Sequence, residues 1–193
     1  VIALMLVLGI LGGMVWALIP ALLKARLGVN EILTSLMLVY VAELALDYLV
    51  RGRWRDPKGF NFPQSVNFEP EATMPLLFEA GRMHLGFALA VVVALAAAVM
   101  MGRTLKGFEI RLVGEAPRAA RFAGFDPARN TLLVFAVSGG LAGLAGIIEV
   151  AGPVGQLQPS ISPGYGFTAI IVAFLGRLKP IGALIAALFL ALT

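Results

Sequence analysis

Long apolar stretches alternate with polar stretches rich in glycine and proline along this chain. A helix crosses the roughly 30 Å hydrocarbon core of a bilayer with about 20 apolar residues, each adding ~1.5 Å. The pattern predicts full spans over residues 1–23, 32–50, 85–102 and 127–150. The apolar stretch 167–175 is short for a span, and a further span begins at residue 181.

Composition extends this picture from single helices to the whole chain. Of 193 residues, 60% are hydrophobic and 13% are charged, whereas soluble domains carry roughly 25% charged residues. One water-soluble core cannot hide so much apolar surface, so a soluble globular domain is excluded. The sequence therefore predicts an all-α, polytopic transmembrane helical bundle of about five to six spans. Because the chain opens at Val1 inside an apolar run and closes at Thr193 early in a span, we expect it to be a fragment, incomplete at both ends.

Basic residues in the connections predict the orientation of the spans. Lysine and arginine gather after the first span, six times within 103–130, and again at Arg177 and Lys179. By parity these connections face one side, which the positive-inside rule assigns to the cytoplasm. The stretch 51–84 is then an outer loop, and 103–130 is a cytoplasmic loop. The stretch 151–166 is either an outside loop or a broken segment that lines a cavity at membrane depth.

Polar residues within a span are the first candidates for function. Glu43 and Asp47 lie one helical turn apart in the second span, where a buried carboxylate costs several kcal/mol. They indicate a substrate pathway or a proton site. The alternative is that both lie at headgroup level, with Asp47 paired to Arg51 or Arg53.

The sequence contains none of the common catalytic motifs that we searched for. It has no cysteine and a single histidine, His84, which we expect at the membrane interface. Serine-hydrolase, zinc-protease and phosphate-loop motifs are missing from the sequence. We therefore expect no catalytic residue, metal or cofactor, and we attribute the net charge of +4 to orientation, with no nucleic acid as partner.

A short amphipathic piece in the cytoplasmic loop, residues 117–123, is the most informative segment. It begins with Pro117, ends before Gly124, and exposes Arg118 and Arg121 together with the apolar Phe122. It is either an ordinary interfacial loop or a helix that docks in a groove of a cytoplasmic partner.

Several motifs in this order resemble a known family. They are Gly28–Tyr40 (GVNEILTSLMLVY), Gly114–Gly124, Ser138–Gly146 (SGGLAGLAG), Gly164-Tyr-Gly-Phe167, Leu175-Gly-Arg177 and Pro180-Ile-Gly182. Together they resemble the ABC transporter permeases of the ribose, nucleoside and branched-chain amino acid importer group. The Asn-Glu-Ile stretch and the outer Phe62-Pro-Gln64 look most like nucleoside or simple-sugar permeases.

The resemblance implies a permease subunit of an ATP-driven importer for nucleosides or simple sugars in the bacterial inner membrane. It implies cytoplasmic ATPase subunits, a second permease subunit, an extracytoplasmic substrate-binding lipoprotein and membrane lipid as partners, and no catalytic site in the permease itself. The family's coupling helix maps onto Glu115, Pro117, Arg118, Ala119, Ala120, Phe122 and Gly124. A neutral cargo rich in hydroxyls makes Thr34, Tyr40, Glu43 and Ser138 candidates for the substrate pathway.

Two alternatives remain open at this stage. In a proton-coupled secondary transporter, Glu43 or Asp47 would relay protons. An intramembrane hydrolase would need a serine or a carboxylate pair with a base, and the sequence shows no such base.

Overall fold

The structure is a computed structural model that describes residues 1–60, 62–75, 84–159, 161–162 and 164–192. The elements in these ranges are all helices, which confirms the predicted all-α class. The chain divides into two compact units. Unit 1 comprises Val1–His84 and Asp126–Ile161, and unit 2 comprises Leu85–Phe125 and Ser162–Thr193.

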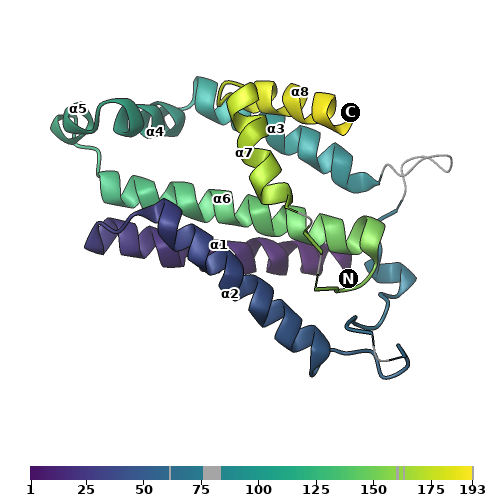
Figure 1. Ribbon diagram of the computed structural model, residues 1–193. Helices are drawn as coiled ribbons and strands as arrows, with labels where there is room; N and C mark the ends of the chain where they lie inside the picture. The colour runs from purple at the N-terminus through teal and green to yellow at the C-terminus, as the bar shows by residue number, and fades with distance from the viewer. Residues whose placement is uncertain (61, 76–83, 160, 163, 193) are drawn as a thin grey trace. The chain divides into compact units, whose positions relative to one another are not determined.

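Unit 1 is built around two long helices, α1 (Ile2–Leu27) and α6 (Pro127–Glu149), which run antiparallel side by side (Figure 1). Glycines allow the two backbones to touch. A Cβ atom added to Gly13 would lie 2.1 Å from the carbonyl oxygen of Gly139, and one added to Gly143 would lie 2.1 Å from that of Gly9. Small residues at helix interfaces permit this close approach inside a membrane.

The third helix of unit 1, α2 (Glu31–Arg51), follows α1 after a short turn. Gly28 ends α1 with φ of 65°, a left-handed conformation that glycine adopts without strain. Asn30 caps α2, since its side-chain oxygen accepts a hydrogen bond of 2.9 Å from the backbone N–H of Ile32. A Lys24–Glu31 ion pair joins the two helices beside the turn.

Two stretches of unit 1 that are far apart in the sequence, residues 65–74 and 150–157, are held together by backbone hydrogen bonds. The helix α6 continues into a π-type turn, η2 (Val150–Val154). A short 3₁₀ turn, η1 (Pro70–Ala72), lies in the stretch 65–74. The N–H of Ser65 donates to the carbonyl of Leu157 (2.9 Å), and that of Met74 donates to Ala151 (2.8 Å). Residues 61 and 76–83 of the predicted outer loop lie outside the described residues.

Unit 2 contains the remaining helices: α3 (Leu85–Arg103), α4 (Leu105–Glu115), α5 (Pro117–Phe122), α7 (Tyr165–Leu175) and α8 (Pro180–Ala191). α8 contacts both α3 and α7, while α4 and α5 follow α3 as a hairpin. Between α7 and α8, Arg177 and Leu178 adopt φ values of 55° and 56°. The sequence predicts a helix within 103–130 only at residues 117–123, so α4 is an additional helix in this stretch.

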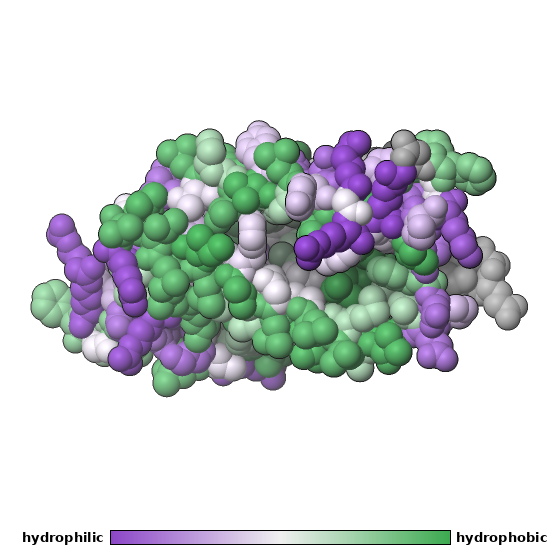
Figure 2. All heavy atoms as spheres, turned by 90° about the horizontal axis from the view of Figure 1, so that it is seen from below, coloured by the Kyte–Doolittle hydropathy of each residue, from purple (hydrophilic) through white to green (hydrophobic). Residues whose placement is uncertain are grey.

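Most large apolar side chains point outward from the helices. Leu4 and Leu44 are 64% and 71% exposed, and Figure 2 shows broad hydrophobic areas on one face of the molecule. α1, α2, α3 and the continuous α6–η2 helix are long and apolar enough to cross a membrane, while α7 and α8 are shorter apolar helices. Exposed apolar surface of this extent is covered by lipid or by further protein.

Candidate functional site

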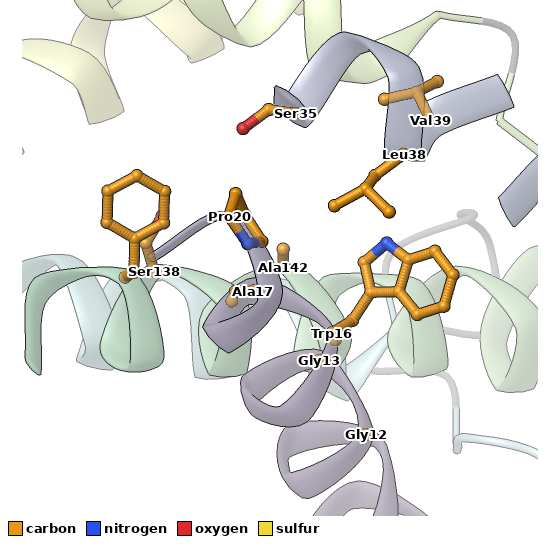
Figure 3. A pocket seen from close by; sticks show the side chains of 13 residues that line it. Gly12, Gly13, Trp16, Ala17, Pro20, Ser35, Leu38, Val39, Ser138 and Ala142 are labelled. Atoms are coloured by element: carbon orange, nitrogen blue, oxygen red, sulfur yellow. The ribbon is translucent and has the colours of Figure 1, made fainter. Parts of the chain in front are cut away.

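A cavity of about 620 Å³ opens among three helices of unit 1, α1, α2 and α6. Figure 3 shows Trp16 of α1 reaching toward Leu38 of α2, with Ser35 above Pro20. Its volume lies in the range of small-molecule sites, roughly 300–1,000 Å³.

The cavity wall is apolar and uncharged, with three polar groups. Among the described residues, no lysine, arginine, aspartate, glutamate or histidine lines it. Its polar side chains are the indole of Trp16 and the hydroxyls of Ser35 and Ser138, and its second aromatic ring is Phe135. Such a wall suits a neutral ligand and gives no counter-ion to a charged one.

The structure brings only one of the predicted pathway residues into this cavity. Ser138 of α6 lines it. The hydroxyl of Thr34 instead donates a hydrogen bond of 3.0 Å to the carbonyl of Asn30, within its own helix. Tyr40 and Glu43 are exposed on α2 and lie outside the lining.

Asp47 is engaged at the far end of α2. The Nε atom of Arg51 lies 2.8 Å from its carboxylate oxygen, the pairing that the sequence offered as the interfacial alternative. Both side chains remain partly exposed, at 62% for Arg51 and 36% for Asp47. An exposed pair of this kind is typical of a helix end and adds little stability.

Two residues of the cavity were missed by sequence reasoning. Trp16 and Ser35 stand in ordinary apolar runs, and only the packing of α6 on α1 shows which face of each helix the cavity uses. A signal for Trp16 was its place near the middle of a 26-residue helix, because tryptophan is enriched at the ends of membrane helices.

A second candidate site is the hairpin of α4 and α5 in unit 2. Thr104 caps α4 by accepting a hydrogen bond of 3.1 Å from the N–H of Gly107. The N–H of Phe125 closes α5 with a bond of 3.0 Å to the carbonyl of Ala120, and Gly124 turns the chain with φ of 83°. The rings of Phe108 and Phe125 meet edge to face at 6.5 Å, which ties the end of α5 to α4.

The hairpin divides its residues between an inner and an outer face. Ala120 is fully buried, so its side chain holds the hairpin together. Phe122 is 94% exposed, and Arg118 and Arg121 stand exposed beside it. Within the described ranges neither arginine pairs with a carboxylate. Glu115, Pro117, Ala119 and Gly124 are also exposed.

In the part of the chain that the structure describes, all elements are helices and four of them are long and apolar enough to cross a membrane, which indicates a multi-pass membrane protein. The model of a family of permease components of branched-chain amino acid transport systems matches residues 1–193, the whole chain. The chain belongs to this family, and it is a plasma-membrane protein.

Individual relatives agree with this assignment. A glucose ABC transporter permease protein of Haloferax volcanii is 42% identical over 97% of this chain and 52% of its own length. A guanosine ABC transporter permease protein of Bacillus subtilis is 32% identical (92% and 52%), and a nucleoside ABC transporter permease protein of Lactococcus lactis is 30% identical (97% and 54%). The chain thus spans about half the length of the curated relatives it matches. No solved structure matches it.

Proposed function

We propose that this chain is the membrane-spanning part of an ATP-driven ABC importer for nucleosides or simple sugars. Its partners are cytoplasmic ATPase subunits, a second permease subunit and an extracytoplasmic substrate-binding lipoprotein. The permease performs no chemistry on the cargo. ATP hydrolysis by the partner subunits drives a change between outward-facing and inward-facing states.

The outer face of the α4–α5 hairpin carries this proposal. Phe122 stands almost fully exposed between unpaired arginines on α5, whose C-terminal end is tied to α4 by the contact of Phe125 with Phe108. A soluble hairpin gains nothing from exposing a phenyl ring, whereas an aromatic anchor with arginines beside it suits a groove on an acidic partner. The proposed contact residues are Arg118, Ala119 and Phe122, while Glu115, Pro117, Ala120 and Gly124 shape the hairpin that presents them.

The proposed cargo class rests on relatives. The similar proteins are named for glucose, guanosine and nucleosides, which are neutral molecules rich in hydroxyls. We propose that cargo passes along α2 and α6, where Thr34, Tyr40, Glu43 and Ser138 offer hydrogen bonds. A proton-coupled transporter would instead need Glu43 for uptake in the absence of any ATPase.

The docking role is tested by site-directed cross-linking in the assembled transporter. The printed chain contains no cysteine, so Phe122→Cys introduces one reactive thiol into it. We expect a maleimide–benzophenone reagent attached to this thiol to photo-cross-link it to the ATPase subunit. Phe60→Cys is the matched control, because Phe60 is also 94% exposed but lies in the predicted outer loop.

A functional variant completes this test. Phe122→Asp is expected to lower ATP-driven uptake by at least tenfold, as loss of a central aromatic anchor does at protein interfaces. Because Phe122 contributes no core packing, the yield and thermal stability of the variant should equal those of the wild type. Cross-linking at neither position, together with wild-type uptake by Phe122→Asp, would contradict the docking role.

A further inference from the structure

We infer that the cavity among α1, α2 and α6 holds an uncharged ring of the cargo, stacked on the indole of Trp16 and bound by the hydroxyls of Ser35 and Ser138. The inference rests on the proposed transport function and assigns the residues that select the cargo. The ring is that of a nucleoside or of a sugar, and the zwitterion of an amino acid is excluded.

The position of Trp16 is the first step. Trp16 lies 11 residues before Leu27, the C-terminal end of α1. At ~1.5 Å per residue this is roughly 16 Å, about half of the ~30 Å hydrocarbon core, so the depth of Trp16 is close to the centre of the membrane. Tryptophan at a membrane protein's lipid surface gathers at the interfaces, where its N–H meets water. At mid-membrane, this indole points instead toward the cavity and keeps 40% of its surface uncovered.

The second step concerns hydrogen bonds. Among the residues that the structure describes, none accepts a hydrogen bond from the Nε1–H of Trp16, and neither Ser35 nor Ser138 has a partner for its hydroxyl. Thr34, Thr131 and Thr168 behave differently, since their hydroxyls bond to backbone carbonyls of their own helix or its cap. Three donors without acceptors therefore line one apolar cavity. Because these three groups make no hydrogen bond within the described part of the chain and remain partly exposed, they are available to bond to a ligand.

The chemistry of the ligand follows from this wall. The indole N–H only donates, so the ligand must carry an acceptor such as a ring hydroxyl or a base carbonyl. The flat indole face offers stacking to a ring. An amino acid would bring an ammonium and a carboxylate to a wall whose described residues carry no charge, where unpaired charges cost several kcal/mol. The cavity of about 620 Å³ has room for one ring with its substituents.

The test uses the full-length permease with its ATPase and binding protein in proteoliposomes. Titration of the binding protein with uridine, glucose and leucine identifies the cargo, and ATP-driven uptake of that cargo is then measured. Trp16→Leu is expected to lower uptake at saturating binding protein about tenfold, the usual effect of losing one stacking partner. Trp16→Phe, which keeps an aromatic face, is expected to stay within about threefold of the wild type.

Two further variants make the result specific. Trp54→Leu is the matched control, because Trp54 is the other tryptophan of the chain and lies outside the cavity lining. It should leave uptake unchanged. Ser35→Ala removes a single hydroxyl without disturbing the fold, and it is expected to lower uptake about fivefold through one lost hydrogen bond. Basal ATP hydrolysis without cargo should also be unchanged in Trp54→Leu.

The outcomes separate this inference from the proposed function. Uptake that needs no ATPase subunit would overturn the importer itself. ATP-driven uptake of leucine, or wild-type uptake of uridine or glucose by both Trp16→Leu and Ser35→Ala, would overturn the cavity assignment and leave the importer standing.

Discussion

Gly12 and Gly13 are neighbours in α1 with opposite surroundings. A Cβ atom on Gly13 would lie 2.1 Å from the carbonyl oxygen of Gly139, whereas one on Gly12 would meet nothing within 4 Å. A single methyl group at position 13 must therefore push α1 and α6 apart. The glycine pattern in the sequence indicates tight helix contacts, but it does not distinguish these two neighbours.

Alanine at each of these positions tests the contact. Gly13→Ala is expected to lower the thermal unfolding midpoint of the purified permease by roughly 2–10 °C, the range that overpacking costs of about 1–3 kcal/mol produce. Gly12→Ala adds the same methyl group to open space and favours the helix, so its midpoint should be equal or higher. Fluorescence-detected size-exclusion chromatography after heating measures both. Equal losses in the two variants would contradict the observed backbone contact.

At the scale of elements, caps and spans are readable from local sequence. Asp126 caps α6 by accepting a hydrogen bond of 2.9 Å from the N–H of Ala128, and Asn30 caps α2. Asparagine and aspartate shortly before an apolar run are typical of such caps, because a cap depends on residues that are neighbours in the chain. The hairpin partner α4 and the π-type turn at Val150–Val154 were not predicted. The π-type turn lies beside bonds from residues 65–74, which are remote in sequence and leave no local signal.

The turn between α7 and α8 gives a prediction at this scale. Leu178 adopts φ of 56° although it is not glycine, and its side chain is 71% exposed, so little packing holds it there. Left-handed backbone costs a non-glycine residue of order 1–2 kcal/mol. We therefore expect Leu178→Gly to raise the unfolding midpoint by up to about 4 °C.

Leu178→Ala is the control for this turn. It removes the same exposed side chain but keeps the Cβ atom and hence the strain. Its midpoint should equal that of the wild type or fall slightly. If the glycine variant melts no higher than the alanine variant, the backbone at this position is not strained in the membrane-embedded protein.

For the whole molecule, charge counting predicts an orientation in the membrane, whereas the sequence does not predict the cavity. Ser138 was found because serine in a glycine-rich span is conspicuous. Trp16 lies on α1 and Ser35 on α2, and both line the same cavity as Ser138. Which residues meet there depends on the angles at which the three helices cross, and the hydrophobic pattern of the sequence does not give these angles. The sequence thus led to the expectation of a site that binds a neutral ligand through hydrogen bonds. Of the residues named for that site, Ser138 alone lines the cavity.

Cysteine labelling in intact cells tests the predicted orientation. Lys58→Cys should react with a membrane-impermeant maleimide added outside, and Arg121→Cys should react only after the cells are permeabilised. The unmodified protein provides the blank, since the printed chain has no cysteine. Labelling of Arg121→Cys in intact cells would place the hairpin outside and rule out contact with a cytoplasmic ATPase.

The backbone contact of α1 with α6 also bears on how the transporter moves. The backbones of α1 and α6 pack directly against each other at their glycines, and small relative displacements would lose this contact. We therefore expect the two helices to move together as one rigid body. α2 is linked to α1 by three residues and a single ion pair beside them, and it forms the remaining wall of the cavity. In the proposed importer, α2 is therefore the wall of the Trp16 cavity that is freest to move, while the closely packed pair of α1 and α6 serves as the fixed frame.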